Sequence, residues 1–346
     1  MDILRHLNHE TVTARPPTWM YRTQKAVRRN RLLFAAGTAV AIALIAGMGT
    51  STWLLLKERE AHKRAVEAER QQARLRHEAE TREKITQATL LINQERYPEV
   101  DELLRKLDIT EPTVEGAAAV RVLGEWHAIE GRYRQASELF RLLMSLDTLD
   151  SWDVQSLDPL RLGPVLVLGG DTAAYVAFRE EMLAKFLANP RPVADRVIKA
   201  CMLTPADDRL LEKLAPLSEL SAQQMREADT NGDAFQAAWI SMSMAIWDYR
   251  RGDLPSAEQW AQRCLAYPDF NAPRAATAHA VLALSLQKRG LIQEARSETL
   301  KARDLIEGKS RVPQGRGTPV QGFWFDWAFA KILLRELETV GGEARP

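Results

Sequence analysis

The sequence predicts an almost entirely α-helical chain with a single transmembrane helix, a helical stalk and an irregular α-solenoid. Three observations predict this fold class. Residues 32–56 contain no charged side chain. Residues 57–84 contain neither Gly nor Pro and are rich in Ala, Glu, Arg and Gln, which form helices readily. From residue 85 to residue 346 apolar residues recur at the helical period, and no convincing hairpin signal appears.

The charge of the whole chain is nearly balanced. Its 346 residues include 47 Lys and Arg and 46 Asp and Glu, which give a net charge of +1. Because no long block of one sign appears, the composition predicts no nucleic-acid partner. The two cysteines, Cys201 and Cys264, are too few for a disulfide framework, and they leave the redox compartment open.

The uncharged segment 32–56 has the length of a membrane span. At about 1.5 Å per residue it reaches roughly 37 Å as a helix, and the hydrocarbon core of a bilayer is ~30 Å thick. It is longer than the ~7–15 apolar residues of a signal-peptide core, and 31 polar and basic residues precede it. We therefore predict a membrane anchor whose partner is membrane lipid.

Small residues form a stripe along this segment. Ala35, Ala39, Ala43, Gly47 and Ser51 recur every fourth residue and so share one face of a helix. Such a face lets two helices approach closely, which permits a homodimer. Ala and Gly are common in membrane helices in general, so the stripe leaves the choice between monomer and homodimer open.

Residues 1–31 are predicted to form a juxtamembrane arm, broken at Pro16-Pro17. The basic residues that end the arm suit the anionic cytoplasmic leaflet. However, residues 17–31 and residues 57–71 each contain five Lys or Arg, so charge alone leaves the orientation open.

Residues 57–84 are predicted to continue the membrane helix outward as a polar stalk. A heptad register over this segment places one good seam residue, Leu75, among Ala, Gln and Arg. The pattern therefore favours a solvated helical spacer over a coiled coil.

A helical repeat appears within residues 85–346. In its clearest copy, Gly124 and Ala136 are small where two paired helices press closest, and Leu123 and Phe140 fill the gap between pairs. Gly131 permits the tight turn between the two helices. This pattern resembles a tetratricopeptide repeat.

The other copies are degenerate. The spacing from Ala257 to Ala295 is 38 residues, whereas the tetratricopeptide repeat has ~34. Residues 160–187 and 195–228 are predicted to be helical pairs that match the repeat poorly. The weaker copies are marked by Ala88, Leu91, Tyr97, Val100, Leu104, Leu107 and Pro112, then by Met244, Ala245, Gly252, Ala257, Ala261 and Cys264, and then by Leu282, Ala283, Leu286, Gly290, Ala295 and Ala302.

The end of the chain is predicted to be a loop followed by a helix. Residues 308–322 contain the turn formers of a loop. The apolar helix from Phe323 to about Val340 is predicted to close the end of the solenoid, leaving an extended concave face for a protein or peptide ligand.

Two local motifs imitate ion or phosphate sites. Residues 229–233 resemble the start of a calcium loop, but Ala234 and Ile240 stand where the motif requires Gly and a bidentate Glu. This segment is interpreted as a helix–helix turn. Residues 308–310 read Gly-Lys-Ser, but Arg303 stands where a phosphate-binding loop requires Gly.

No other constellation predicts chemistry, so the sequence predicts no catalytic, cofactor-binding or metal-binding residue and no enzymatic activity. There is no Cys-x-x-Cys, no nucleophile elbow and no dinucleotide fingerprint. No histidine has a partner at ligand spacing; the histidines are His6, His9, His62, His77, His127 and His279. Core packing is favoured over a binding groove for the tryptophans in predicted helices, which are Trp126, Trp239, Trp247, Trp260, Trp324 and Trp327.

The amino-terminal phrase DILRHLNHETVTARPPTWMYRTQKAVRRNRLLFAAG resembles the segment that follows the catalytic domain in a group of large bacterial membrane serine/threonine protein kinases. Later phrases at residues 169–175, 197–205 and 324–327 are also similar, so the resemblance covers nearly the whole chain. The catalytic domain itself is absent, because the glycine-rich loop, the Val-Ala-Ile-Lys strand and the His-Arg-Asp and Asp-Phe-Gly motifs are missing.

The resemblance implies a location and a function. Residues 1–31 are expected to be a cytoplasmic, kinase-tail-like arm, with the repeat domain on the other side of the inner (plasma) membrane. We expect a signalling, non-catalytic carboxyl-terminal part of a split or truncated kinase, acting as an interaction or sensor module for protein or peptide partners. The alternative is a free-standing, membrane-anchored tetratricopeptide-repeat scaffold or chaperone-like protein of envelope assembly.

Overall fold

The computed structural model describes residues 19–106, 113–146, 152–187, 193–268, 270–310, 317–318 and 322–342. These residues are almost entirely helical, which confirms the all-α prediction. The chain divides into two compact units, Met1–Glu80 and Thr81–Pro346.

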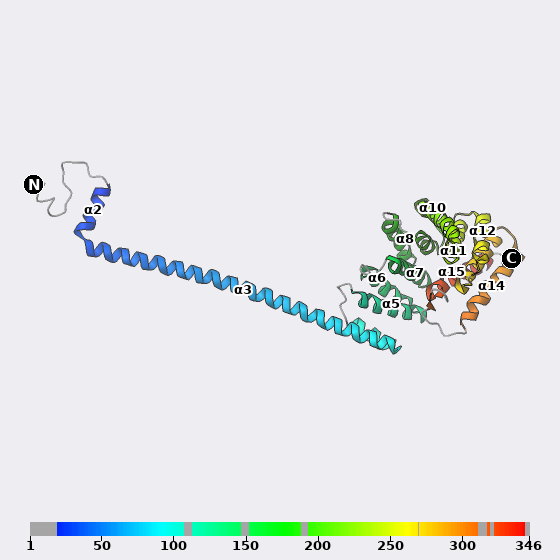
Figure 1. The fold of residues 1–346 in the computed structure, drawn as a ribbon, viewed down its shortest axis with the longest axis horizontal. Coiled ribbons are helices and arrows are strands. Elements are labelled where there is room, and N and C mark those ends of the chain that lie inside the picture. The colour runs from blue at the N-terminus through cyan, green and yellow to red at the C-terminus, as the bar shows by residue number, and fades with distance from the viewer. Residues whose placement is uncertain are drawn as a thin grey trace, which may run out of the picture. The chain divides into compact units, whose positions relative to one another are not determined.

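Helix α3 (Arg31–Asn93) runs without interruption through both the predicted membrane span and the predicted stalk (Figure 1). It follows α2 (Trp19–Arg29). The continuity was predicted, because residues 57–84 offer neither Gly nor Pro to end a helix. Among the residues that the structure describes, α3 is the one helix long and apolar enough to cross a bilayer, judged by length and composition alone.

The second unit is built mainly from pairs of helices joined by turns. The last turns of α3 belong to this unit, where Ile85, Ala88 and Ile92 are buried, and α4 (Tyr97–Arg105) follows. The pairs are α5 (Val114–Ile129) with α6 (Tyr133–Leu146), α7 (Trp152–Leu168) with α8 (Thr172–Leu187), α9 (Ala194–Cys201) with α10 (Asp208–Asn231), α11 (Ala234–Arg250) with α12 (Leu254–Ala266), and α13 (Ala272–Lys288) with α14 (Ile292–Ser310).

The packing predicted for the clearest copy is present between α5 and α6. Gly131 has a φ of 74°, in the left-handed region, and its turn is closed by a 2.8 Å hydrogen bond from Arg132 N to His127 O. A Cβ atom placed on Gly124 would lie 2.6 Å from Cε1 of the buried Phe140 ring. The small residue therefore lets the two helices approach each other, as the sequence predicted.

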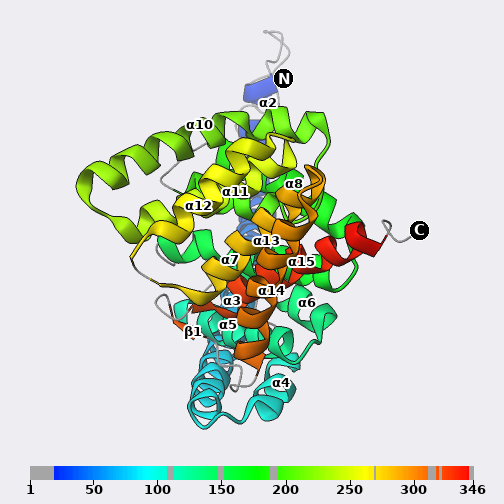
Figure 2. The ribbon, with the colours of Figure 1, turned by 90° about the vertical axis from the view of Figure 1, so that its right-hand side faces the viewer.

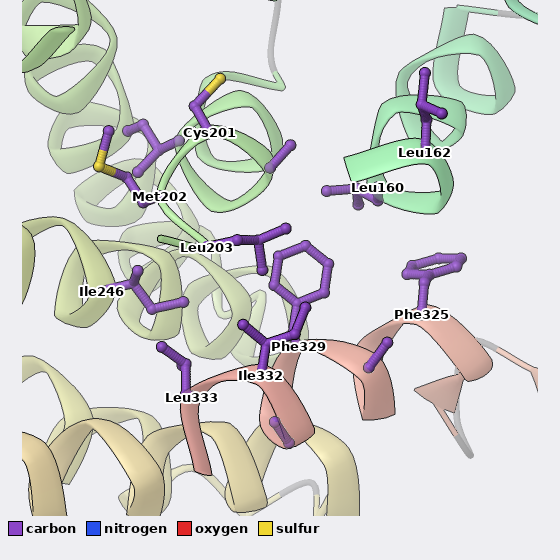
Figure 3. Packing of buried hydrophobic residues seen from close by; sticks show 14 of the residues in the cluster. Leu160, Leu162, Cys201, Met202, Leu203, Ile246, Phe325, Phe329, Ile332 and Leu333 are labelled. Atoms are coloured by element: carbon purple, nitrogen blue, oxygen red, sulfur yellow. The ribbon is translucent and has the colours of Figure 1, made fainter. Parts of the chain in front are cut away.

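The first helices of successive pairs form a continuous layer: α7 contacts α9, α9 contacts α11, and α11 contacts α13. Helix α15 (Trp324–Gly342) lies against this layer, in contact with α7, α13 and α14 (Figure 2). Figure 3 shows Phe329 and Leu333 of α15 pointing toward Leu203, after α9, and Ile246 of α11.

The expectation that the final helix closes one end of the repeat array is therefore wrong. Phe325, Phe329 and Leu333 are at most 1% exposed, and almost every other apolar residue of the helix is buried too. Residues 324–334 carry only two charged side chains, Asp326 and Lys331. A helix segment that is apolar around most of its circumference becomes stable by being surrounded, whereas an end cap needs a polar outer face along its length. Helix α15 consequently forms part of the interior of the second unit.

The predicted loop at residues 308–322 is also partly wrong. Helix α14 extends through the first three of these residues, and two short strands, β1 (Gly317–Thr318) and β2 (Gly322–Phe323), pair antiparallel. Strands of two residues are too short to produce a visible alternation of apolar and polar residues, which is why no hairpin signal was apparent. Strand β2 leads directly into α15 and contacts α13.

Candidate ligand-binding cleft

The segment that imitates a calcium loop is a helix–helix turn, as interpreted from the sequence. Gly232 ends α10 with a φ of 72°, and Asp233 Oδ1 accepts a 3.0 Å hydrogen bond from Gln236 N at the start of α11. Asp229 forms an ion pair with Arg263, and its Oδ1 accepts a hydrogen bond from Tyr267 Oη at 2.7 Å. Its carboxylate is therefore engaged within the protein.

The remaining sequence candidates are placed without forming a chemical site. Residues 308–310 lie at the end of α14. His127 Nε2 lies 3.2 Å from Asp101 Oδ1, and its Nδ1 accepts a 2.8 Å hydrogen bond from Arg132 Nε. Burial lowers the pKa of His127, which favours the neutral ring in a packing position.

The other histidines are equally uninformative. His62 and His77 are exposed on α3, His279 Nδ1 pairs with Glu298 at 2.5 Å, and His6 and His9 lie outside the described residues. Within the described part of the chain, no group of three His, Cys, Asp or Glu side chains could hold a metal ion.

Two of the three later phrases that the sequence singled out, residues 169–175 and 197–205, meet in space. Tyr175 Oη donates to Ala200 O at 2.8 Å and accepts from Leu203 N at 3.1 Å. Arg179 donates to Cys201 O at 2.8 Å and to Thr204 O at 2.7 Å. These bonds satisfy the buried backbone where α9 ends, and they fix the irregular segment that follows it.

A buried ion pair joins α9 to α15. Lys199 Nζ lies 3.2 Å from Asp326 Oδ1, and both side chains are 5% exposed. The Lys199 ammonium also lies over two aromatic faces, 4.5 Å from the centroid of Trp239 and 5.0 Å from that of Phe329. Asp326 Oδ2 accepts a 3.0 Å hydrogen bond from Phe323 N, which orients the carboxylate at the start of α15.

A cleft of about 200 Å³ lies beside this ion pair, between α7, α9, α11 and the junction of β2 with α15. Its aromatic wall contains two pairs of rings. Phe235 and Trp239 meet edge to face with centroids 6.3 Å apart, and Phe323 and Phe325 stack at 5.0 Å. Phe235 is 41% exposed.

The most distinctive polar group of the cleft is Asp195, near the start of α9. Asp195 is one of the residues that line the cleft, it is 4% exposed, and its Oδ1 is buried without a hydrogen-bond partner. Burial raises the pKa of Asp195. The charges of Arg196 and Lys199 oppose this effect, as do hydrogen bonds to the carboxylate from its own backbone N–H and from that of Arg196. A buried carboxylate without a full set of partners is costly, and such groups concentrate at binding and catalytic sites.

The cations of the cleft are already engaged. Lys199 is held by Asp326, and Arg196 Nη1 donates to Ser156 Oγ. The cleft therefore combines apolar aromatic faces with an acceptor that lacks a partner. This arrangement can bind and orient a ligand.

The sequence did not identify this cleft. Trp239 was interpreted as a core residue, and Phe235 and Asp195 were not singled out as site residues. Lys199 and Asp326 appeared only within the phrases at residues 197–205 and 324–327. A signal existed, because Phe235 and Trp239 are four residues apart, as are Asp195 and Lys199, and each pair shares one helix face. What the sequence could not supply was the meeting of α9, α11 and α15.

Comparisons with known proteins identify no family for this chain. No protein-family model matches it, and no curated protein matches its sequence. The crystal structure of BtubC (BKLC) from P. vanneervenii aligns with 69% of this chain and 96% of that chain, with 15% sequence identity and a TM-score of 0.38. At that level of similarity, neither the fold nor any function of BtubC carries over.

Proposed function

We propose that this chain is a membrane-anchored interaction or sensor module that binds a protein or peptide partner through tetratricopeptide-like helical repeats. The observation that carries the proposal is the cleft beside Lys199 and Asp326, where exposed aromatic surface lies next to an unsatisfied carboxylate oxygen. Aromatic surface around a few oriented polar groups is the usual composition of a ligand site.

The position of the cleft supports binding at one edge of the repeats. Helix α15 lies against the layer formed by α7, α9, α11 and α13 and covers that face of the layer. A partner therefore cannot use the covered face while α15 is bound there. The cleft lies where α15 begins, and Phe235, which lines it, is 41% exposed. A partner that reaches this point needs no rearrangement of the interior.

The membrane context of the proposal rests on α3 and on the kinase resemblance. Residues 32–56 would anchor the chain in the inner membrane, with residues 1–31 in the cytoplasm and the repeats on the other side. In this proposal the chain is the non-catalytic, carboxyl-terminal part of a bacterial serine/threonine protein kinase, and it does not itself transfer phosphate.

The experiment is site-specific photo-crosslinking of the full chain in intact cells. We expect a photoreactive benzoyl-phenylalanine at Phe235 to capture a partner protein or peptide, while the same group at Ile292, which is 57% exposed and outside the cleft, captures none. Capture of a protein kinase supports the kinase context, whereas capture of an envelope-assembly protein favours the scaffold alternative. Equal capture at both positions, or none at Phe235, contradicts binding at the cleft.

A further inference from the structure

We infer that the cleft binds one neutral aromatic side chain of a peptide partner, a Trp or Tyr whose N–H or O–H donates a hydrogen bond to Asp195. This inference rests on the proposed function, because it specifies the side chain that anchors the proposed partner. It follows from the shape of the cleft, from its unsatisfied acceptor and from the state of its cations.

The size and the walls of the cleft select an aromatic ring. Its volume of about 200 Å³ lies below the ~300–1,000 Å³ of sites for drug-sized ligands, and so it suits a single side chain. Phe235 and Trp239 already meet edge to face, and Phe323 stacks on Phe325. An incoming ring extends these contacts in the offset or edge-to-face geometry that aromatic rings prefer.

The buried carboxylate selects a hydrogen-bond donor. Asp195 is one of the residues that line the cleft, and its Oδ1 is shielded from water and has no partner. The terminal torsion of aspartate is broad, so a small rotation turns this oxygen toward a ligand. A donor from the ligand would satisfy an acceptor that the protein leaves unpaired.

The charges of the cleft favour a neutral ligand. Two cations already lie over the Trp239 ring, Lys199 at 4.5 Å and Arg274 at 5.5 Å from its centroid, so a third cation would be repelled. An anion would have to displace Asp326 from Lys199 or Ser156 from Arg196. A free amino acid brings a carboxylate that meets the same obstacle. A side chain within a peptide brings neither terminal charge, so a peptide is the source that we assign.

The test measures binding of small probes to the full chain in lipid nanodiscs by saturation-transfer NMR. The probes are N-acetyl-tryptophan amide and N-acetyl-tyrosine amide, each with a partner methylated on the indole nitrogen or the phenol oxygen. We expect at least one parent probe to bind, and methylation to weaken its binding roughly tenfold, because it removes the hydrogen bond to a charged acceptor. Phe235→Ala should abolish binding, and Phe270→Ala, at a 70% exposed position outside the cleft, should preserve it.

Equal binding of parent and methylated probes would overturn the assigned hydrogen bond without depending on any protein variant. Tighter binding of free tryptophan than of its blocked amide would overturn the peptide assignment, and tighter binding of N-acetyl-arginine amide would overturn the neutral ligand. If no probe binds while Phe235 still captures a partner in cells, the inference fails and the proposed function stands. If both experiments are negative, both fail.

Discussion

Replacing Gly124 by Ala tests the closest approach between α5 and α6. The added Cβ would lie 2.6 Å from Phe140 Cε1 and 3.0 Å from both Cδ1 and Cζ, whereas carbon atoms in favourable contact are ~3.5–4.0 Å apart. The ring is fully buried, and it stacks on Trp324 at 5.9 Å with an angle of 8° between the planes. Phe140 must therefore move by roughly 1 Å against a packed neighbour.

Two effects of opposite sign determine the result. Ala stabilises a helix interior by about 1 kcal/mol relative to Gly, while overpacking a core costs about 1–3 kcal/mol. We expect Gly124→Ala to lower the free energy of unfolding by about 1 kcal/mol. The matched control is Gly308→Ala in α14, where a Cβ meets nothing within 4 Å, and we expect it to raise stability by up to about 1 kcal/mol.

The assay is urea unfolding of the full chain in detergent, followed by tryptophan fluorescence, with midpoints compared at equal m-values. Phe140→Leu should offset part of the loss in the Gly124→Ala background, because the two sites are in contact and their effects are not additive. If Gly124→Ala stabilises the chain as much as Gly308→Ala does, the helices are not in close contact at this point and the packing argument is refuted.

Three further outcomes are expected. Asp195→Asn should stabilise the chain near pH 7, and this gain should disappear in acid. Because the folded pKa of Asp195 is raised, the wild type is relatively most stable below the unfolded pKa, and it loses that advantage as pH rises through the folded pKa. Paired pH titrations of the stability of the two proteins would show this difference. Glu336→Ala should cost about 3–5 kcal/mol in urea unfolding, and Glu336→Gln less, because the alanine leaves the buried Arg250 guanidinium without its two 2.6 Å contacts. Cys201 and Cys264 are buried, and burial raises the pKa of Cys201 to about 12, so neither should react with a maleimide near neutral pH before denaturation. In intact cells, labelling of Gln71→Cys should then report which side of the membrane the stalk is on, and labelling of Thr23→Cys should report the side of the arm. Labelling of Thr23→Cys alone by an impermeant reagent would reverse the proposed orientation.

Local features of the fold could be predicted where neighbouring residues determine them. The uncharged segment 32–56 and the segment 57–84, which lacks Gly and Pro, predicted the continuous helix α3. Gly131 predicted a turn and Gly124 a close helix contact, and the structure contains both. The helix at the carboxyl terminus was predicted within a residue or two of its observed ends, Trp324 and Gly342.

The environment of that last helix could not be predicted, because it depends on contacts between residues far apart in the sequence. Lys199 meets Asp326, 127 residues further along the chain, and Arg250 meets Glu336, 86 residues further along. The cleft has the same origin, since Asp195, Trp239 and Phe323 come from three separate elements. Helical periodicity shows that Trp239 lies on a helix, but core-facing and cleft-facing positions on that helix have the same period.

The central claim is that a partner binds at the cleft between α9, α11 and α15. Hydrogen–deuterium exchange of the full chain in nanodiscs, with and without the partner captured at Phe235, tests this claim most directly. We predict slower exchange in α9 and in the first two turns of α11 when the partner is present, with α14 unchanged. Slower exchange confined to α14, or no change in α9 and α11, would contradict the claim.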